Sequence, residues 1–207
     1  MKWIKCQVDE ENQTAFSDAQ EGWGDLKKLD GFLGQVGGWD RKNSFEAAIL
    51  SFWRDYESYQ QFMNHDHDEI VERNGQKNTY NKIYVAFFEV ILEISSTNMT
   101  KFLRNGKILR TAEYDAALNK QAHFEHIQQE VWNKGMVESP GMLACVFCKK
   151  HNYKPVYLVA SLWDNNHSHQ EYADNKLPSL IKQAGAEDSE IIITENLIEM
   201  NPKWTVI

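Results

Sequence analysis

The chain has 207 residues, of which 42% are hydrophobic and 25% are charged, and its formal net charge is −8. This composition is typical of a globular protein and excludes a chain that is disordered throughout. The acidic balance argues against a dedicated surface for nucleic acid or for an anionic membrane, so we expect neither as a partner.

No apolar run approaches the roughly 20 residues that a membrane-spanning helix needs. The longest run, 83–94, is interrupted by Glu89 and Glu93. The first residues lack a long apolar segment followed by small residues, which predicts no secretory signal peptide. Three Cys, an odd and low number, do not make a disulfide scaffold. We therefore expect a soluble protein of the reducing cytoplasm.

The first half of the chain predicts the order strand, helix, strand, strand, helix, strand. The first helix is expected over 11–28, because four apolar residues recur on one helical face, and Gly31 ends it. A second helix is expected from Tyr56 to about residue 70, with a break near His65. The strands are expected over residues 2–8, 32–40, 45–54 and 80–94.

The second half repeats this order. Residues 31–34 (GFLG) correspond to 141–144 (GMLA), and 50–53 (LSFW) correspond to 160–163 (ASLW), both at an offset of 110 (141 − 31). Such self-similarity indicates an internal duplication. The elements expected here are strand 107–114, helix 117–134, strands 141–150 and 155–163, helices 167–175 and 178–184, strand 189–200, and 203–207 as an edge strand.

The boundaries of the two halves follow from composition. Residues 95–100 are polar, which is typical of a linker. The sequence therefore predicts a first unit over 1–95, a linker over 96–106 and a second unit over 107–207. Within the second unit, Pro178 is expected to open a new helical turn and to break the preceding one.

The strands indicate how the two units combine. In 47–53, 83–90 and 156–162 both alternating sets of side chains are apolar, whereas a sheet with one solvated face alternates between apolar and polar residues. Each unit's two helices can cover one face, and the second unit's sheet is the obvious cover for the other. We therefore predict an α+β fold in which two tandem ferredoxin-like (βαββαβ) units pack face to face or close into a barrel.

A known family shares this pattern. A βαββαβ unit with Gly-Phe-Leu-Gly opening its second strand and Phe-Trp closing its third resembles the dimeric α/β-barrel superfamily. The strand-to-helix segment 52–62 resembles its antibiotic-biosynthesis-monooxygenase-like group, and the chain is similar to a bacterial family of duplicated proteins without an assigned function. The resemblance implies an intramolecular version of the usual homodimeric barrel, and hence a monomer (a pseudo-dimer) or a weak homodimer.

The resemblance also implies candidate site residues. The haem-degrading branch has Asn, Trp and His where this chain has Gln7, Phe62 and Glu72, so we expect no haem and no other cofactor. The monooxygenase branch often carries His in and just after the second helix, where Phe62 and His67 stand. The leading hypothesis is cofactor-independent oxidation of a small aromatic molecule, with His67 moving a proton.

Further side chains are candidates for the pocket wall. Trp53 and Trp39 end predicted strands, where an aromatic ring can stack on a flat ligand, and Gln7 and His65 complete the expected ligand-binding set with Phe62. The alternative for both Trp is core packing. The alternative function is a non-catalytic small-molecule-binding or stress-associated protein.

Two clusters could bind metal, and we expect neither to do so. The run His65-Asp66-His67-Asp68-Glu69 holds ligand-type side chains, but residues two apart on a continuous helix point apart, and a polar helix break is the simpler interpretation. Cys145 and Cys148 form a lone CxxC within a predicted strand, where their thiols face opposite sides. We expect both to be buried structural cysteines.

Overall fold

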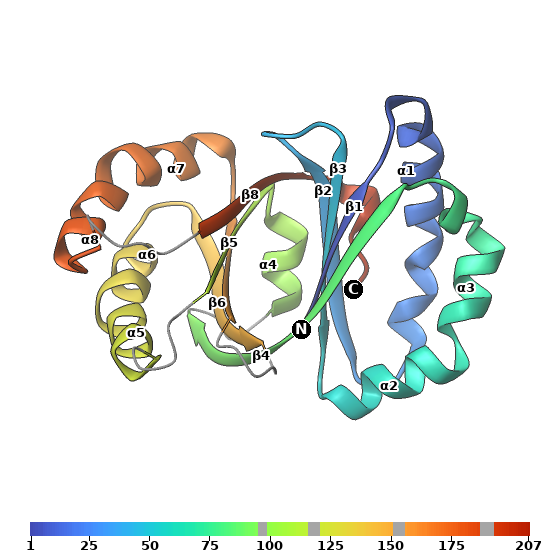
Figure 1. Ribbon diagram of the computed structural model, residues 1–207, viewed down its shortest axis with the longest axis horizontal. Helices are drawn as coiled ribbons and strands as arrows, with labels where there is room; N and C mark the ends of the chain where they lie inside the picture. Colours follow the sequence, from blue (N-terminus) through green and yellow to red (C-terminus); the bar gives the residue numbers. More distant parts are fainter. Residues whose placement is uncertain (95–98, 116–120, 151–155, 187–192) are drawn as a thin grey trace. The chain divides into compact units, whose positions relative to one another are not determined.

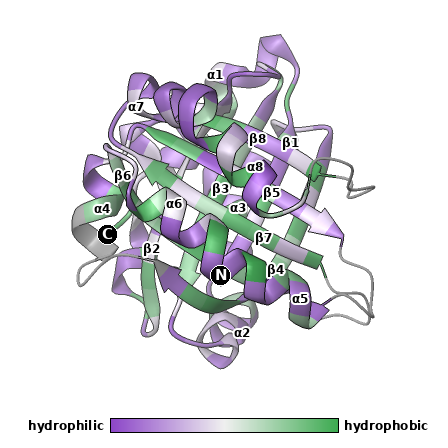
Figure 2. Ribbon diagram, turned by 90° about the vertical axis from the view of Figure 1, so that its left-hand side faces the viewer, coloured by the Kyte–Doolittle hydropathy of each residue, from purple (hydrophilic) through white to green (hydrophobic). Residues whose placement is uncertain are grey.

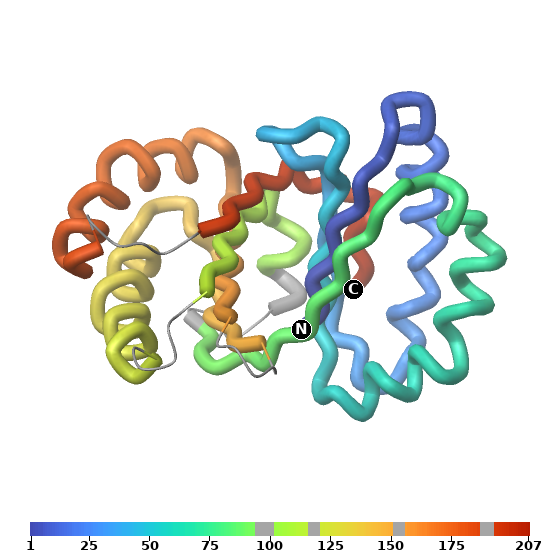
Figure 3. The backbone as a smooth tube through the Cα atoms, in the orientation of Figure 1, coloured from blue at the N-terminus to red at the C-terminus, as the bar shows by residue number. Residues whose placement is uncertain are grey.

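The computed structural model describes residues 1–94, 99–115, 121–150, 156–186 and 193–207. The chain divides into two compact units, one of Met1–Phe87 with Ile198–Ile207 and the other of Phe88–Leu197. The last ten residues therefore pack with the first unit, and Figure 3 shows the red C-terminal end of the chain in the same part of the molecule as its blue beginning.

The strands are hydrogen-bonded in the order β1-β3-β2-β8-β5-β7-β6-β4, which closes into a barrel. This confirms the predicted α+β fold of ferredoxin-like units in a pseudo-dimeric barrel. The strands are β1 (Lys2–Gln7), β2 (Phe32–Asp40), β3 (Glu46–Trp53), β4 (Lys82–Ile94), β5 (Ile108–Asp115), β6 (Met142–Lys150), β7 (Val156–Trp163) and β8 (Ile193–Met200).

The helices of the first unit lie along one face of its strands (Figure 1). The predicted first helix is α1 (Gln13–Glu21), which tightens into a 3-10 segment at Gly22–Lys28, because its two glycines hold an α-helix weakly. The predicted break near His65 is confirmed, since Asp66 separates α2 (Tyr56–His65) from α3 (His67–Asn74). A short 3-10 turn, Gln76–Asn78, leads to β4.

On the strands of the first unit, the side chains that point to either face of the sheet are buried. On β3, Ala47 and Ile49 pack in one cluster with Phe16 of α1, while the intervening Ala48 and Leu50 are buried as well. This is the two-sided apolar pattern that the sequence predicts. In Figure 2 the strands are largely coloured as hydrophobic and the outer helices largely as hydrophilic.

The helices of the second unit differ from the prediction at Pro178. Pro178 does open α8 (Leu177–Gln183), but no gap precedes it, because α7 (Asn166–Glu171) continues through a π-helical turn, Tyr172–Lys176. The wider turn changes the hydrogen-bond register before the residue that lacks an N–H. A second π turn, Gln128–Asn133, joins α5 (Gln121–Ile127) to α6 (Lys134–Val137).

Two further segments correct the prediction. Part of the expected linker forms helix α4 (Met99–Asn105), and residues 96–98 lie outside the described residues. Residues 203–207 form no extended edge strand: Pro202–Trp204 is a 3-10 turn, and Val206 makes one isolated bridge to Gln35. The beginnings of the helix expected at 117 and of the strands expected at 155 and 189 also lie outside the described residues.

Candidate functional site

A cavity of about 340 Å³ lies in the first unit. Side chains from all four of its long strands and from its helical layer line the cavity, so it occupies the space between sheet and helices. A cavity of this size is at the lower end of the range for small-molecule sites. It falls in the half of the chain where the sequence carries the candidate His residues.

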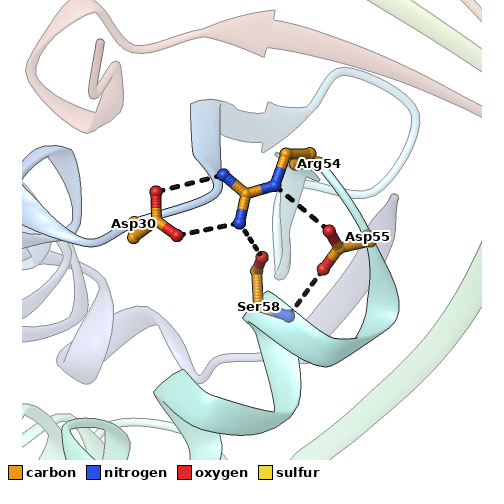
Figure 4. A network of polar contacts seen from close by, with 4 residues as sticks. All are labelled: Asp30, Arg54, Asp55 and Ser58. Atoms are coloured by element: carbon orange, nitrogen blue, oxygen red, sulfur yellow. Dashed lines mark hydrogen bonds and ion pairs between the residues drawn. The ribbon is translucent and has the colours of Figure 1, made fainter.

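The helix that forms part of the wall is anchored by a polar network at the β3–α2 junction (Figure 4). Arg54 donates two parallel hydrogen bonds to Asp30, at 3.0 and 2.8 Å, and a third of 3.0 Å to the Ser58 hydroxyl. Asp55 caps α2 by accepting the Ser58 backbone N–H at 2.7 Å, and this bond lowers the pKa of Asp55 to about 2. The network sets where α2 begins and therefore which of its residues face the sheet.

A close approach explains the glycine that precedes β2. Gly31 has a φ of +77°, and a Cβ at this position would lie 2.2 Å from the Ser58 hydroxyl. Both the backbone conformation and the lack of space favour glycine here.

Aromatic rings form one wall of the cavity. Trp53 of β3 stacks on Phe62 of α2 with ring centroids 5.0 Å apart and an interplanar angle of 22°. The rings of His67 and Phe62 are nearly perpendicular, with centroids 5.5 Å apart, and the Trp23 centroid lies 5.9 Å from that of the same imidazole. Such flat, polarisable surfaces suit a planar ligand.

His67 adds an imidazole to this aromatic wall. Its side chain is 23% exposed, and Nδ1 lies 2.8 Å from the carboxylate of Asp68, which is solvent-exposed. With Nδ1 protonated and donating to Asp68, Nε2 remains an acceptor. In that tautomer the imidazole keeps one acceptor nitrogen, and His67 is one of the residues that line the cavity.

Polar side chains line other parts of the cavity. Lys2 is 7% exposed, and burial lowers the pKa of its amine to about 8. Gln76 links two helical segments, accepting from the Trp23 indole and donating to Gln20 at 2.7 Å. Burial also raises the pKa of the Cys6 thiol to about 12, so this thiol stays protonated.

The structure brings together three of the six predicted site residues. His67, Trp53 and Phe62 line the cavity. Trp39 instead packs against Phe16 and Trp204, with centroids 5.7 and 5.6 Å away.

Gln7 and His65 also lie away from the cavity wall. Gln7 ends β1 opposite Glu46 and Lys82, and His65 is an exposed residue at the end of α2. The core-packing alternative therefore describes Trp39, whereas Trp53 is both buried and part of the cavity wall.

The cavity also uses residues that the sequence analysis missed, among them Lys2, Gln35 and Ser51. A signal for Lys2 does exist. It shares the alternating face of the first strand with Ile4 and Cys6, so a lysine occupies a position in an otherwise apolar series.

No described residues form a group of three or more His, Cys, Asp or Glu side chains placed to hold a metal ion. Cys145 and Cys148 are buried free cysteines, as predicted, and burial raises the pKa of the Cys145 thiol to about 12. Among the helices in the described ranges, none is long and apolar enough to cross a membrane.

Solved structures share the fold at low sequence identity. A candidate monooxygenase from Fusobacterium nucleatum superposes with a TM-score of 0.74 at 11% identity, covering 97% of this chain and 92% of that chain. One from Lactobacillus acidophilus gives 0.72 at 12% identity, covering 99% and 94%. An anthrone oxidase-like protein gives 0.68 at 13% identity, covering 97% and 90%. At these identities the likeness concerns the fold alone.

Sequence relatives define the family. Residues 1–88 match the family described as Domain of unknown function (DUF4937). Over 92 residues the chain is 41% identical to the uncharacterised protein YdbC of Bacillus subtilis, covering 43% of this chain and 76% of YdbC. The chain therefore belongs to the family of the uncharacterised protein YdbC.

Proposed function

We propose that the cavity of the first unit binds a small aromatic molecule and promotes its oxidation by dioxygen without a bound cofactor. The observation that carries this proposal is the juxtaposition of the Trp53–Phe62 wall with His67 in one cavity. The monooxygenase-like fold is consistent with it.

In this reaction the protein only has to bind the substrate and transfer a proton. In an activated ring such as an anthrone, a CH₂ group becomes C=O, one oxygen atom of O₂ enters the product and the other leaves as water. The substrate supplies all four electrons. His67 Nε2 takes the proton that generates the electron-rich carbanion, and the aromatic wall orients the ring and excludes water.

Dioxygen consumption with anthrone and 1,8-dihydroxyanthrone as probes, both of which carry the activated CH₂ group, tests this function. We expect a rate above the protein-free background that falls by about 100-fold in His67→Gln, because a positioned acid-base group contributes roughly that factor. His65→Gln is the matched control, since His65 is exposed and does not line the cavity. An unchanged rate in a folded His67→Gln protein would remove His67 from the mechanism.

A second candidate function is non-catalytic binding, which the largely apolar and aromatic lining favours. It predicts saturable binding of the same probes with no dioxygen consumption above background. For either function we propose a cytoplasmic monomer or weak homodimer, because one chain carries both ferredoxin-like units. Light scattering during size-exclusion chromatography measures that state.

A further inference from the structure

Three polar side chains form a row across adjacent strands of the first unit. Ser51 of β3 is paired with Lys2 of β1 on one side and with Gln35 of β2 on the other. Directly opposed residues of antiparallel strands project from the same face of the sheet, and neighbouring strands lie about 5 Å apart. All three side chains line the cavity, so they present a continuous polar strip to whatever occupies it.

The strip offers hydrogen-bond donors and a positive charge. Among the described residues, no carboxylate forms an ion pair with Lys2, whose ammonium lies 5.2 Å from the centroid of the Tyr59 ring. The Gln35 Nε2 group is buried and has no hydrogen-bond partner in the described part of the chain. The Ser51 hydroxyl accepts from the Trp53 indole at 3.3 Å, which leaves its own proton to donate.

Burial makes this arrangement costly for the protein alone. Lys2, Ser51 and Gln35 are 7%, 3% and 4% exposed, respectively. Burying a lysine that no described carboxylate pairs, and leaving the Gln35 amide N–H without a partner, both cost free energy of folding. A ligand with an anionic oxygen would offset that cost.

The second unit provides an internal comparison. At the same places in its strands, Ser161 is paired with Arg110 on one side and with Cys145 on the other, and the Trp163 indole again donates to the serine, at 3.0 Å. Here the cation already has a partner, because Arg110 forms an ion pair with Glu195. The amide position is occupied by a thiol. In the second unit the charged member of the row is thus paired within the protein, whereas in the first unit Lys2 has no carboxylate partner among the described residues and Gln35 Nε2 has no hydrogen-bond partner among them.

We propose that the cavity selects aromatic molecules that carry an anionic oxygen, a carboxylate or a phenolate, and that Lys2, Ser51 and Gln35 bind this oxygen. The inference rests on the proposed function, because it takes the cavity as the ligand site. The aromatic wall then holds the ring while the polar strip fixes which end of the ligand points toward β1. Within a buried site, a charged hydrogen bond of this kind discriminates strongly against a neutral analogue.

Two probes of nearly equal shape isolate the charge. We would measure the binding of 2-naphthoate and of neutral 2-naphthamide by calorimetry near pH 7, for wild type and for Lys2→Met, Lys2→Arg and Lys5→Met. Lys5→Met is the matched control: it removes the same charge from the same strand, three residues along and hence on the opposite face.

We expect wild type and Lys5→Met to bind naphthoate at least about tenfold more tightly than naphthamide, the factor that one charge-assisted hydrogen bond supplies. Lys2→Met should lose this preference while still binding naphthamide, and Lys2→Arg should retain most of it. Binding of naphthamide by Lys2→Met also shows that the variant is folded and its cavity intact.

The contrary outcomes separate the two proposals. Equal binding of both probes by wild type, or a preference that survives in Lys2→Met, would overturn the anion site while leaving the cavity as a ligand site. No binding of either probe by wild type would overturn this inference together with the aromatic-ligand function.

Discussion

Lys2 lowers the stability of the folded protein, but it is also the residue that we propose binds the anionic oxygen of the ligand. The residue is 7% exposed, and burial holds the pKa of its amine near 8, well below the ordinary value of 10.5. The free energy of unfolding therefore carries a penalty for the charged amine at neutral pH. A purely structural position in this strand would be occupied better by a hydrophobic residue.

The first prediction concerns this penalty. Between the folded pKa near 8 and the unfolded value of 10.5, the unfolded chain binds more protons at Lys2, so the free energy of unfolding should rise with pH. Lys2→Met should be more stable than wild type at pH 7, by roughly 1–3 kcal/mol, and this advantage should shrink as the pH rises to about 9.

Urea unfolding at pH 7, 8 and 9 measures this effect. The range stops near pH 9 because the ordinary pKa of the neighbouring Cys6 thiol is 9.0 and its folded value is about 12, so above that point the contribution of Cys6 to the slope opposes that of Lys2. A Lys2→Met protein that is less stable than wild type at every pH would contradict the account.

At the scale of single elements, local chemistry predicted most boundaries. The break at His65 followed from the polar run that begins there, and the extent of β2 agreed with its apolar pattern. Pro178 was misjudged because a π turn accommodates it, and the hydrogen-bond register of a turn leaves no signature in a single sequence. The N-cap of α2 at Asp55 links such local chemistry to the cavity.

The second prediction compares two caps of the same kind. Asp55 and Asn165 each accept the backbone N–H of the serine three residues later, at 2.7 and 2.9 Å, and thereby cap α2 and α7. Asp55→Ala and Asn165→Ala should each lower the melting temperature. Asp55→Ala alone should also weaken 2-naphthamide binding several-fold, because α2 carries Phe62 on the cavity wall.

Thermal melts and calorimetric titrations on both variants test this comparison. If Asn165→Ala weakened probe binding as much as Asp55→Ala, the ligand site could not be assigned to the first unit through α2.

At the scale of the whole molecule, the repeated pattern of the sequence was sufficient to predict the fold. The residues that line the cavity were anticipated in part. His67 and Phe62 followed from the family resemblance, whereas Lys2 and Gln35 were missed because the absence of a partner is a property of the folded structure. Trp39 was placed wrongly on the pocket wall because Trp204, from the far end of the chain, packs against it.

The third prediction concerns that terminal segment. Trp204 is fully buried in a cluster with Phe16 and Val8, all within the first unit. Trp204→Ala should destabilise this unit by about 3–5 kcal/mol, the usual cost of removing a large buried aromatic side chain. Chemical denaturation measures the loss, and Lys203→Ala, at an exposed neighbouring position, is the control.

A loss below about 1 kcal/mol in Trp204→Ala would contradict the assignment of the last ten residues to the first unit. A similar loss in Lys203→Ala would point instead to a general effect on the C-terminal turn.

The central claim is that the cavity of the first unit is a site for an aromatic anion, and a crystal structure with 2-naphthoate tests it most directly. The account predicts electron density for the naphthalene ring beside Trp53, Phe62 and His67, with the carboxylate within hydrogen-bonding distance of Lys2. Naphthoate bound elsewhere, or a cavity that holds ordered water alone at saturating naphthoate, would contradict it.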